Sequence, residues 1–153
     1  MISKKTKYAL KAAIYLAREY EKGPILIADL ARDEKIPKKF LELILLAMKN
    51  NGILMSKKGK NGGYYLAKSP RTVSMGQIVR IMEGTVAPVP CVSESSYEKC
   101  EECENESTCG IRIVMKDVRD VIANILDNAT LADVLEKIDM AQQKGRDTLN
   151  FVI

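Results

Sequence analysis

The feature that most constrains the fold is a turn rich in glycine and lysine between two short apolar runs. Residues 57–63 read KKGKNGG, and they separate the apolar run 53–56 (ILMS) from the run 64–67 (YYLA). Two short strand-like segments around a glycine and asparagine turn are typical of a β-hairpin. A lysine-rich tip is usually only a solvated turn, so the meaning of this hairpin depends on what precedes it.

Three helices are expected before the hairpin. Ser3 is a good N-cap, and apolar residues at helical spacing predict a first helix over residues 4–21. Residues 27–34 predict a short second helix. A third helix opens at Ile36-Pro37 and closes at Asn50-Asn51-Gly52. We expect its apolar positions to pack inward, namely Phe40, Leu41, Ile44, Leu45, Ala47 and Met48.

A short helix and a polar, cysteine-rich segment follow the hairpin. Ser74 is expected to cap a helix that runs through Glu83. Residues 84–90 contain two prolines and read as a linker without regular structure. Residues 91–109 hold four cysteines, six acidic residues and almost nothing apolar.

A strong helix is predicted over residues 110–127, and Thr130 can cap a last helix over 131–143. The apolar tail, residues 149–153, is expected to dock on another surface. Periodicity alone leaves it open whether the long helix is buried inside one protomer or forms a dimer interface. Its apolar residues step by three and four: Ile111, Val114, Met115, Val118, Val121, Ile122 and Ile125.

Composition excludes several classes of function. The chain has no histidine, which rules out Ser-His-Asp and Cys-His catalysis and histidine-ligated metals. No apolar run is long enough to span a membrane, and no signal peptide is recognisable, so a cytoplasmic protein is expected. Residues 1–70 hold 15 lysines and arginines against 6 acidic residues, whereas residues 71–153 hold 9 against 14. The basic half suits a polyanionic partner, or its cations simply solvate helix faces.

Helix, short turn, helix and basic hairpin, in this order, indicate a winged helix-turn-helix in a mainly α fold. In such a fold the second helix of the pair enters the major groove of DNA and presents its first residues to the base edges. Each signal is weak alone, but their combination favours a DNA-binding protein. The residues expected to contact double-stranded DNA are Lys38, Lys39 and Glu42 in the helix, and Lys57, Lys58, Lys60, Asn61, Gly62 and Tyr64 in the hairpin.

These segments resemble the Rrf2 family of winged helix-turn-helix transcriptional regulators, the group of IscR, NsrR and CymR. Residues 36–42 (IPKKFLE) and 49–54 (KNNGIL) are similar to the family's third helix. Residues 58–64 (KGKNGGY) resemble its Arg-Gly-x-x-Gly-Gly-Tyr wing, with Lys58 in place of the arginine. Residues 7–10 (KYAL), 81–84 (IMEG) and 150–153 (NFVI) fit the same family.

The resemblance implies a regulator, not an enzyme, that binds a near-palindromic operator as a homodimer. It also implies a division of the chain into three parts. Residues 1–83 would form the winged helix-turn-helix, residues 84–109 the linker and the cysteine loop, and residues 110–153 the dimerisation helix, the last helix and the tail.

The four cysteines, Cys91, Cys100, Cys103 and Cys109, are spaced C-x8-C-x2-C-x5-C and are the only cysteines in the chain. Their polar surroundings argue against core filling, since free cysteine is normally buried. A disulfide is less favoured in the cytoplasm, so metal binding is the leading interpretation. Structural zinc sites usually show two Cys-x2-Cys pairs and this chain has one, whereas iron–sulfur clusters accept unevenly spaced thiolates. Both metals stay open on this chemistry.

The resemblance shifts the weight towards an iron–sulfur cluster, either [2Fe–2S] or [4Fe–4S]. Cluster-binding members of the family place three cysteines in this loop, and Cys91, Cys103 and Cys109 match that trio by spacing. The fourth ligand departs from the family: Arg112 stands where one branch has a histidine, and Tyr8 where another has an acidic residue. Cys100 can complete the set, as can an acidic residue of 98–106 or a residue of the partner subunit.

The hypothesis from sequence is therefore a dimeric regulator that senses redox state, nitric oxide or iron–sulfur status. One rival is a winged-helix regulator with structural zinc or with a small-molecule or partner signal. A less favoured rival is an iron–sulfur electron carrier, which would have no use for a basic first half or a wing. Salt-dependent, sequence-selective DNA binding would exclude the carrier.

Overall fold

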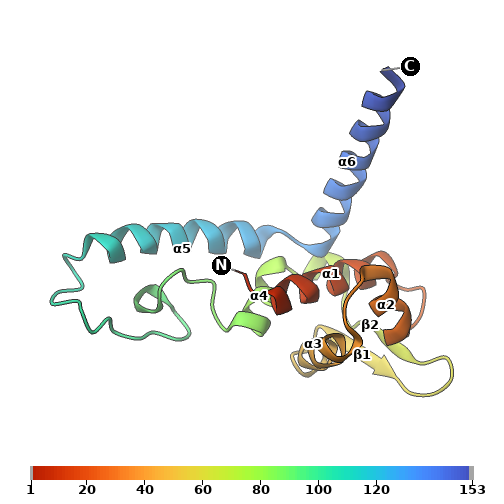
Figure 1. Cartoon of the computed structure of the whole chain (residues 1–153), viewed down its shortest axis with the longest axis horizontal. Coiled ribbons are helices and arrows are strands. Elements are labelled where there is room, and N and C mark those ends of the chain that lie inside the picture. The colour runs from red at the N-terminus through yellow and green to blue at the C-terminus, as the bar shows by residue number, and fades with distance from the viewer. Residues whose placement is uncertain (1, 152–153) are drawn as a thin grey trace.

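The computed structural model of the chain describes the backbone of residues 2–151 and the side chains of residues 2–148. It confirms a mainly α fold with one small antiparallel hairpin (Figure 1). The elements, in order, are α1 (Lys4–Arg18), α2 (Ile27–Glu34), α3 (Lys38–Asn50), β1 (Leu54–Lys57), β2 (Gly63–Leu66), η1 (Pro70–Thr72), α4 (Met75–Glu83), η2 (Pro90–Val92), α5 (Gly110–Asn128) and α6 (Leu131–Phe151). Among the described residues, no helix combines the length and apolarity needed to cross a membrane.

The hydrophobic core lies in one lobe made of α1 to α4 and the hairpin. The alanines of α1 are buried on the side that packs against α3 and α4, and their small side chains let the helices approach closely. The core is completed by residues from every element of the lobe and by the first residue of α6. The largest fully buried side chains are Leu16, Leu30, Leu41, Ile44, Leu45, Met48, Leu54, Ile78 and Leu131.

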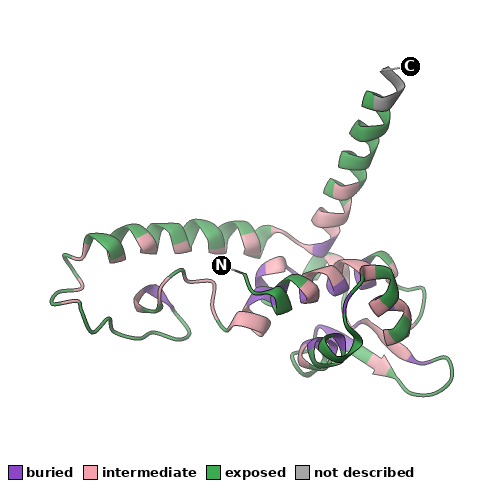
Figure 2. Ribbon diagram, viewed as in Figure 1, coloured by how far each residue is buried: buried purple, intermediate pink, exposed green. Residues whose placement is uncertain are grey.

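Two long helices project from this lobe. In Figure 1, α5 runs away to the left and α6 points away from the lobe, so that both present much surface to solvent (Figure 2). Their junction is attached to the lobe by a short β-bridge between Ser74 and Thr130. The Met75 N–H donates to the Ala129 carbonyl and the Leu131 N–H donates to the Val73 carbonyl, both at 2.8 Å. The junction is therefore fixed although most of α5 and α6 is exposed.

The predicted caps are confirmed. The side chain of Ser3 accepts a hydrogen bond from the Thr6 N–H, and Ser74 forms a reciprocal capping box with Gln77. The hydroxyl of Thr130 accepts one from the Asp133 N–H at 3.1 Å. Each hydrogen bond satisfies a donor that the first turn of a helix leaves free.

The predicted ends of two helices were wrong. The first helix ends at Arg18, not at residue 21, because Glu21 takes a left-handed conformation ahead of Gly23 and Pro24. The last helix continues to Phe151, well past residue 143. The glycine at position 145 costs a helix only about 1 kcal/mol, which the helix-forming residues around it offset. The docking expected of the tail, residues 149–153, concerns side chains outside the described residues.

The burial predicted from the apolar pattern of α3 was also wrong at one position. Phe40 was expected to pack inward, but its side chain is 56% exposed. Leu43 and Leu46 are exposed as well, at 64% and 47%. The inward face of α3 consists of Leu41, Ile44, Leu45 and Met48. A helix of 13 residues that is apolar on two faces has only one face covered by the lobe.

The carboxylate of Glu83 joins the end of α4 to the start of α1. It accepts hydrogen bonds from the Ser3 N–H at 2.8 Å and from the buried hydroxyl of Thr6. The hydrogen bonds from Ser3 and Thr6 lower the pKa of Glu83. This contact ties two ends of the lobe that are 80 residues apart in sequence.

We expect Glu83→Gln to lower the free energy of unfolding by about 1 kcal/mol at neutral pH, because hydrogen bonds to a charged acceptor are stronger than those to an amide. The folded-state pKa is depressed, so the contribution is complete above the unfolded value of about 4.3 and is lost as the pH falls through the folded value. Urea denaturation at neutral and acidic pH measures this. The two proteins should converge at low pH, and a gap that does not depend on pH would contradict the assignment.

Candidate functional site

The start of α3 is held in position by the turn that precedes it. Lys35 takes a left-handed conformation at the end of α2, which reverses the chain, and Ile36 is then buried in the core. The helix that follows presents Lys38, Lys39 and Glu42 as exposed side chains. The α2–turn–α3 unit therefore has the layout of a helix-turn-helix, with the predicted contact residues of α3 facing outward.

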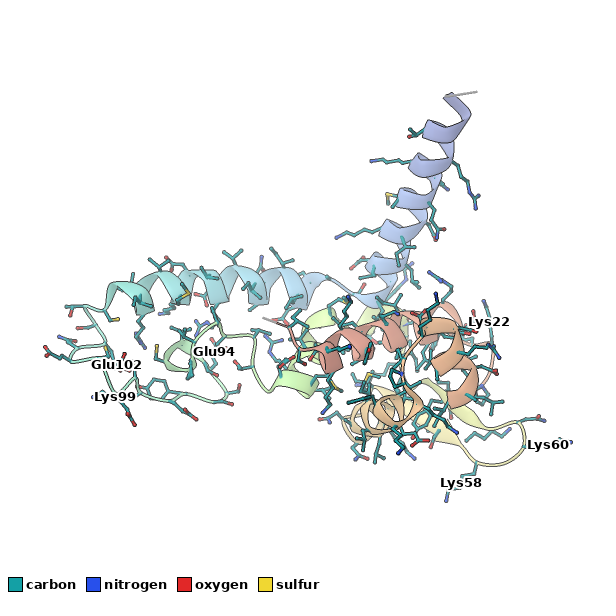
Figure 3. The ribbon with its side chains drawn as sticks, viewed as in Figure 1. Lys22, Lys58, Lys60, Glu94, Lys99 and Glu102 are labelled. Carbon is teal, nitrogen blue, oxygen red and sulfur yellow. The ribbon has the colours of Figure 1, made fainter. Side chains whose placement is uncertain are left out.

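A groove of about 440 Å³ lies between the starts of α2 and α3 and the hairpin. The structure brings six of the nine predicted DNA-contacting residues to it, and Lys39, Lys60 and Asn61 are exposed outside it. Figure 3 shows Lys58 and Lys60 on the hairpin tip, which projects from the lobe. The six residues are Lys38, Glu42, Lys57, Lys58, Gly62 and Tyr64. Sequence reasoning missed the third wall of the groove, which Leu26, Ile27 and Ala28 form at the start of α2.

Two glycines of the hairpin are required by contacts within the chain. A Cβ on Gly62 would lie 2.1 Å from the Lys57 carbonyl oxygen, and a Cβ on Gly63 would lie 2.1 Å from the Ile25 carbonyl oxygen. Ile25 and Tyr64 exchange two backbone hydrogen bonds of 2.9 Å, which fix the hairpin to the segment before α2. The fold of the wing itself therefore needs both glycines.

We expect Gly63→Ala to lower the free energy of unfolding by about 2 kcal/mol, because Gly63 has a φ of +148° and no space for a methyl group. Thermal denaturation measures the loss. Gly145→Ala is the control, since nothing lies within 4 Å of an added Cβ there and the change should be neutral or stabilising. An unchanged Tm for Gly63→Ala would show that the wing does not rest on Ile25.

The second candidate site is the cysteine loop at the far end of α5. All four cysteines line a single cavity of about 290 Å³, together with the start of α5. Cys100 is exposed and the other three are partly buried, and all four are free thiols. Among the side chains that the structure describes, no three cysteine or acidic groups converge closely enough to hold a single metal ion. The predicted ligands thus share a site, but in an open arrangement.

The environment of the thiols differs between Cys103 and Cys109. Cys109 is the N-cap residue of α5, and the backbone N–H of Arg112 in the first turn is the main cause that lowers the pKa of its thiol. Partial burial and a hydrogen bond to Cys109 raise the pKa of the Cys103 thiol. A helix N-terminus stabilises negative charge, so Cys109 is the member of the pair better suited to exist as a thiolate.

Two arginines of α5 hold the first part of the loop. Arg112 donates from Nε to the Cys91 carbonyl at 3.3 Å, and Arg119 donates from Nη1 to the Val92 carbonyl at 2.7 Å. The side chain of Arg119 is only 13% exposed and also lies 3.6 Å from the Glu94 carboxylate. The position where one family branch has a histidine is therefore occupied by a residue that binds the loop backbone.

The other end of α5 is bound to α4. The guanidinium of Arg80 forms a bidentate ion pair with the Asp127 carboxylate, with a distance of 3.0 Å between Nη2 and Oδ2. A Cβ on Gly76 would lie 2.1 Å from this carboxylate, so the glycine makes room for the pair. The same helix thus contacts the cysteine loop at its start and the basic lobe at its end.

Along its length, α5 has no buried residue (Figure 2). Burial of this helix inside one protomer, one of the two possibilities from sequence, is therefore wrong. A contiguous apolar stripe that is exposed along a helix is typical of an interaction surface. Of the seven residues predicted to dimerise, Met115 is half-buried and the other six are exposed. Their exposed fractions are 69% for Ile111, 56% for Val114, 38% for Val118, 58% for Val121, 36% for Ile122 and 62% for Ile125.

Comparison with known proteins gives a consistent result. Residues 2–137 match the model of the Rrf2 family, described as an iron-dependent transcriptional regulator. An Rrf2-like HTH-type transcriptional regulator of Rhodobacter capsulatus is 41% identical over 138 residues, which cover 88% of this chain and 92% of that protein. The structure of CymR, the global cysteine regulator of B. subtilis, is 29% identical, covers 90% of this chain and 97% of its own, and superposes with a TM-score of 0.74. The structure of T. potens IscR is 27% identical, covers 93% and 90%, and has the same TM-score.

Proposed function

Because the chain belongs to the Rrf2 family of transcriptional regulators and is therefore a DNA-binding regulator rather than an enzyme, we propose that it acts as a homodimer whose DNA affinity depends on an iron–sulfur cluster. In this proposal residues 1–83 bind a near-palindromic operator, residues 84–109 hold the cluster and residues 110–153 dimerise. The signal is a change in redox state, nitric oxide or iron–sulfur supply. The observation that carries the proposal is the gathering of all four cysteines around one cavity at the start of α5.

The residues present suit an iron–sulfur cluster. Four thiols are a complete ligand set for a [2Fe–2S] or a [4Fe–4S] cluster, with Cys100 as the fourth ligand in place of a histidine. Structural zinc sites usually contain two Cys-x2-Cys pairs, whereas this chain has one such pair, Cys100 and Cys103, and two outlying cysteines. A cavity of about 290 Å³ has room for a group of several atoms. When bound, the cluster would supply a redox-active centre.

The contacts at the two ends of α5 suggest how the site communicates with the DNA-binding lobe. Arg112 and Arg119 hold the backbone of the loop against the helix, and Cys109 is itself the N-cap. At the other end, Arg80 and Asp127 bind α5 to α4. A change in ligation at the loop would thus be transmitted to the orientation of the lobe. Two recognition helices fit successive major grooves only at a spacing of about 34 Å, so a small rotation is enough to change affinity.

Anaerobic purification or reconstitution with iron and sulfide tests the proposal. We expect a visible absorption band, with iron and acid-labile sulfide in equal amounts. Zinc without sulfide would instead establish the structural-zinc alternative. Binding to DNA is then compared between the cluster-loaded and cluster-free proteins, and equal affinities for a selected duplex would rule out sensing through the cluster.

The wing gives a separate prediction about DNA. Lys58→Gln should reduce the slope of log K against log salt concentration by about 2 for a dimer, because each subunit loses one phosphate contact. The affinity for all sequences should fall together. Lys144→Gln in α6 is the control, since it removes the same charge outside the lobe. Fluorescence anisotropy at a series of salt concentrations measures both slopes, and equal slopes would exclude the wing tip from the interface.

A further inference from the structure

The outward face of α3 carries leucines where a solvent-exposed helix face normally carries polar residues. The core side of the helix is formed by Leu41, Ile44, Leu45 and Met48. At 100° per residue, the opposite side is centred on Lys39, Leu43, Leu46 and Asn50. Leu43 is 64% exposed and Leu46 is 47% exposed, so each keeps much of its apolar surface in water. No packing within the described part of the chain explains this surface.

The charged residues around these leucines are mostly basic. Lys38 and Lys39 precede them and Lys49 follows them on the same helix, with Glu42 as the only acidic residue of α3. The neighbouring hairpin adds three lysines and no acidic residue between positions 54 and 66. Two copies of this face would repel each other, whereas a polyanion would be attracted. A partner that presents apolar groups between negative charges fits the surface best.

The major groove of DNA has this chemistry. Phosphates line its edges, and the 5-methyl group of thymine is an apolar group on its floor that apolar side chains recognise. We propose that Leu43, together with Leu46 one turn further along α3, contacts thymine methyl groups and thereby selects operators with thymine at the positions the two leucines reach. This inference rests on the proposed DNA-binding role of α3 and adds a specificity that the lysines and Glu42 do not provide.

The test uses DNA in which only the methyl group is removed. A duplex that the wild-type protein prefers is selected from a random pool, and each thymine in the half-sites is replaced in turn by uracil. Removing one buried methyl group should cost about fourfold in affinity, and about 15-fold when it is removed from both half-sites. Leu43→Ala and Leu46→Ala should bind thymine and uracil duplexes equally at the position each leucine reads. Both leucines are exposed, so circular dichroism should show unchanged folding.

Met55→Ala is the matched control, because Met55 is an apolar residue of the hairpin that is 50% exposed and lies outside α3. It should keep the full preference for thymine over uracil. A selected duplex that shows no penalty for uracil at any position would overturn the inference and leave the DNA-binding role intact. Failure to select any duplex would overturn both. If Leu43→Ala changes the oligomeric state instead, the leucines form an interface between copies and the inference is wrong.

Discussion

Replacing Cys109 by serine is expected to abolish the visible absorption of the anaerobically reconstituted protein and to remove nearly all of its iron. Cys109 is the N-cap of α5, and its thiol has a lowered pKa, so its loss removes the ligand best suited to be a thiolate. Cys103→Ser should have the same effect, because its thiol lies next to Cys109. Iron and sulfide analysis together with the absorption spectrum measures both losses. The free energy of unfolding of the cluster-free proteins should change little, since neither residue belongs to the core.

Cys100→Ser distinguishes the possible fourth ligands. If Cys100 completes the set, this variant loses the cluster or holds it with a changed spectrum; if an acidic residue or the partner subunit supplies the ligand, the spectrum is unaltered. Ser96→Ala is the control, as it changes an exposed residue of the same loop and removes no thiol. Full absorption and full iron content in Cys103→Ser and Cys109→Ser would refute the cluster assignment.

Introducing a charge into the exposed stripe of α5 is expected to convert the proposed dimer into monomers. Val121 is 58% exposed and lies near the middle of the helix, where two copies related by a twofold axis would cross. Val121→Glu would bury two unpaired carboxylates in one interface. At several kcal/mol for each buried charge, the dissociation constant should rise at least about 1,000-fold. Sedimentation velocity over a concentration series measures the change.

Lys116→Gln serves as the control for this substitution. It changes the net charge by the same one unit, but position 116 lies on the opposite side of α5 from the stripe and is exposed. This variant should remain dimeric. Binding of Val121→Glu to a selected palindromic duplex should weaken, because each monomer contacts one half-site alone. A Val121→Glu protein that remains dimeric would place the interface elsewhere.

Local sequence features predicted most of the secondary structure correctly. Ser3, Ser74 and Thr130 start helices where expected, because their side chains accept hydrogen bonds from backbone groups within three residues. The glycine-tipped hairpin forms between the predicted apolar runs, with Leu54 paired to Leu66 and Lys57 to Gly63. Helix ends were less accurate, since propensity alone does not show that the helix after Leu131 continues past Gly145.

The candidate sites, too, were predictable from the sequence only in part. The residue types and their spacing pointed to a basic wing and a cysteine ligand set, because those signals lie within short segments. The exposure of Leu43 and Leu46 was not predictable, since an apolar residue in a helix looks the same whether it faces a core or solvent. The requirement for glycine at position 63 was not predictable for a related reason: the atoms that exclude a side chain there include the Ile25 carbonyl, nearly forty residues earlier in the chain.

By itself, the sequence determined the order of the elements, the caps of the helices and the chemical character of each segment, because these depend on interactions between near neighbours. Only the tertiary structure decided which surfaces remain free and which distant groups meet. It left the stripe of α5 without cover, gathered Cys91, Cys100, Cys103 and Cys109 around one cavity, and bound α5 to α4 through Arg80 and Asp127. Such contacts depend on how whole elements pack, and no local pattern encodes which of several apolar faces the packing will cover.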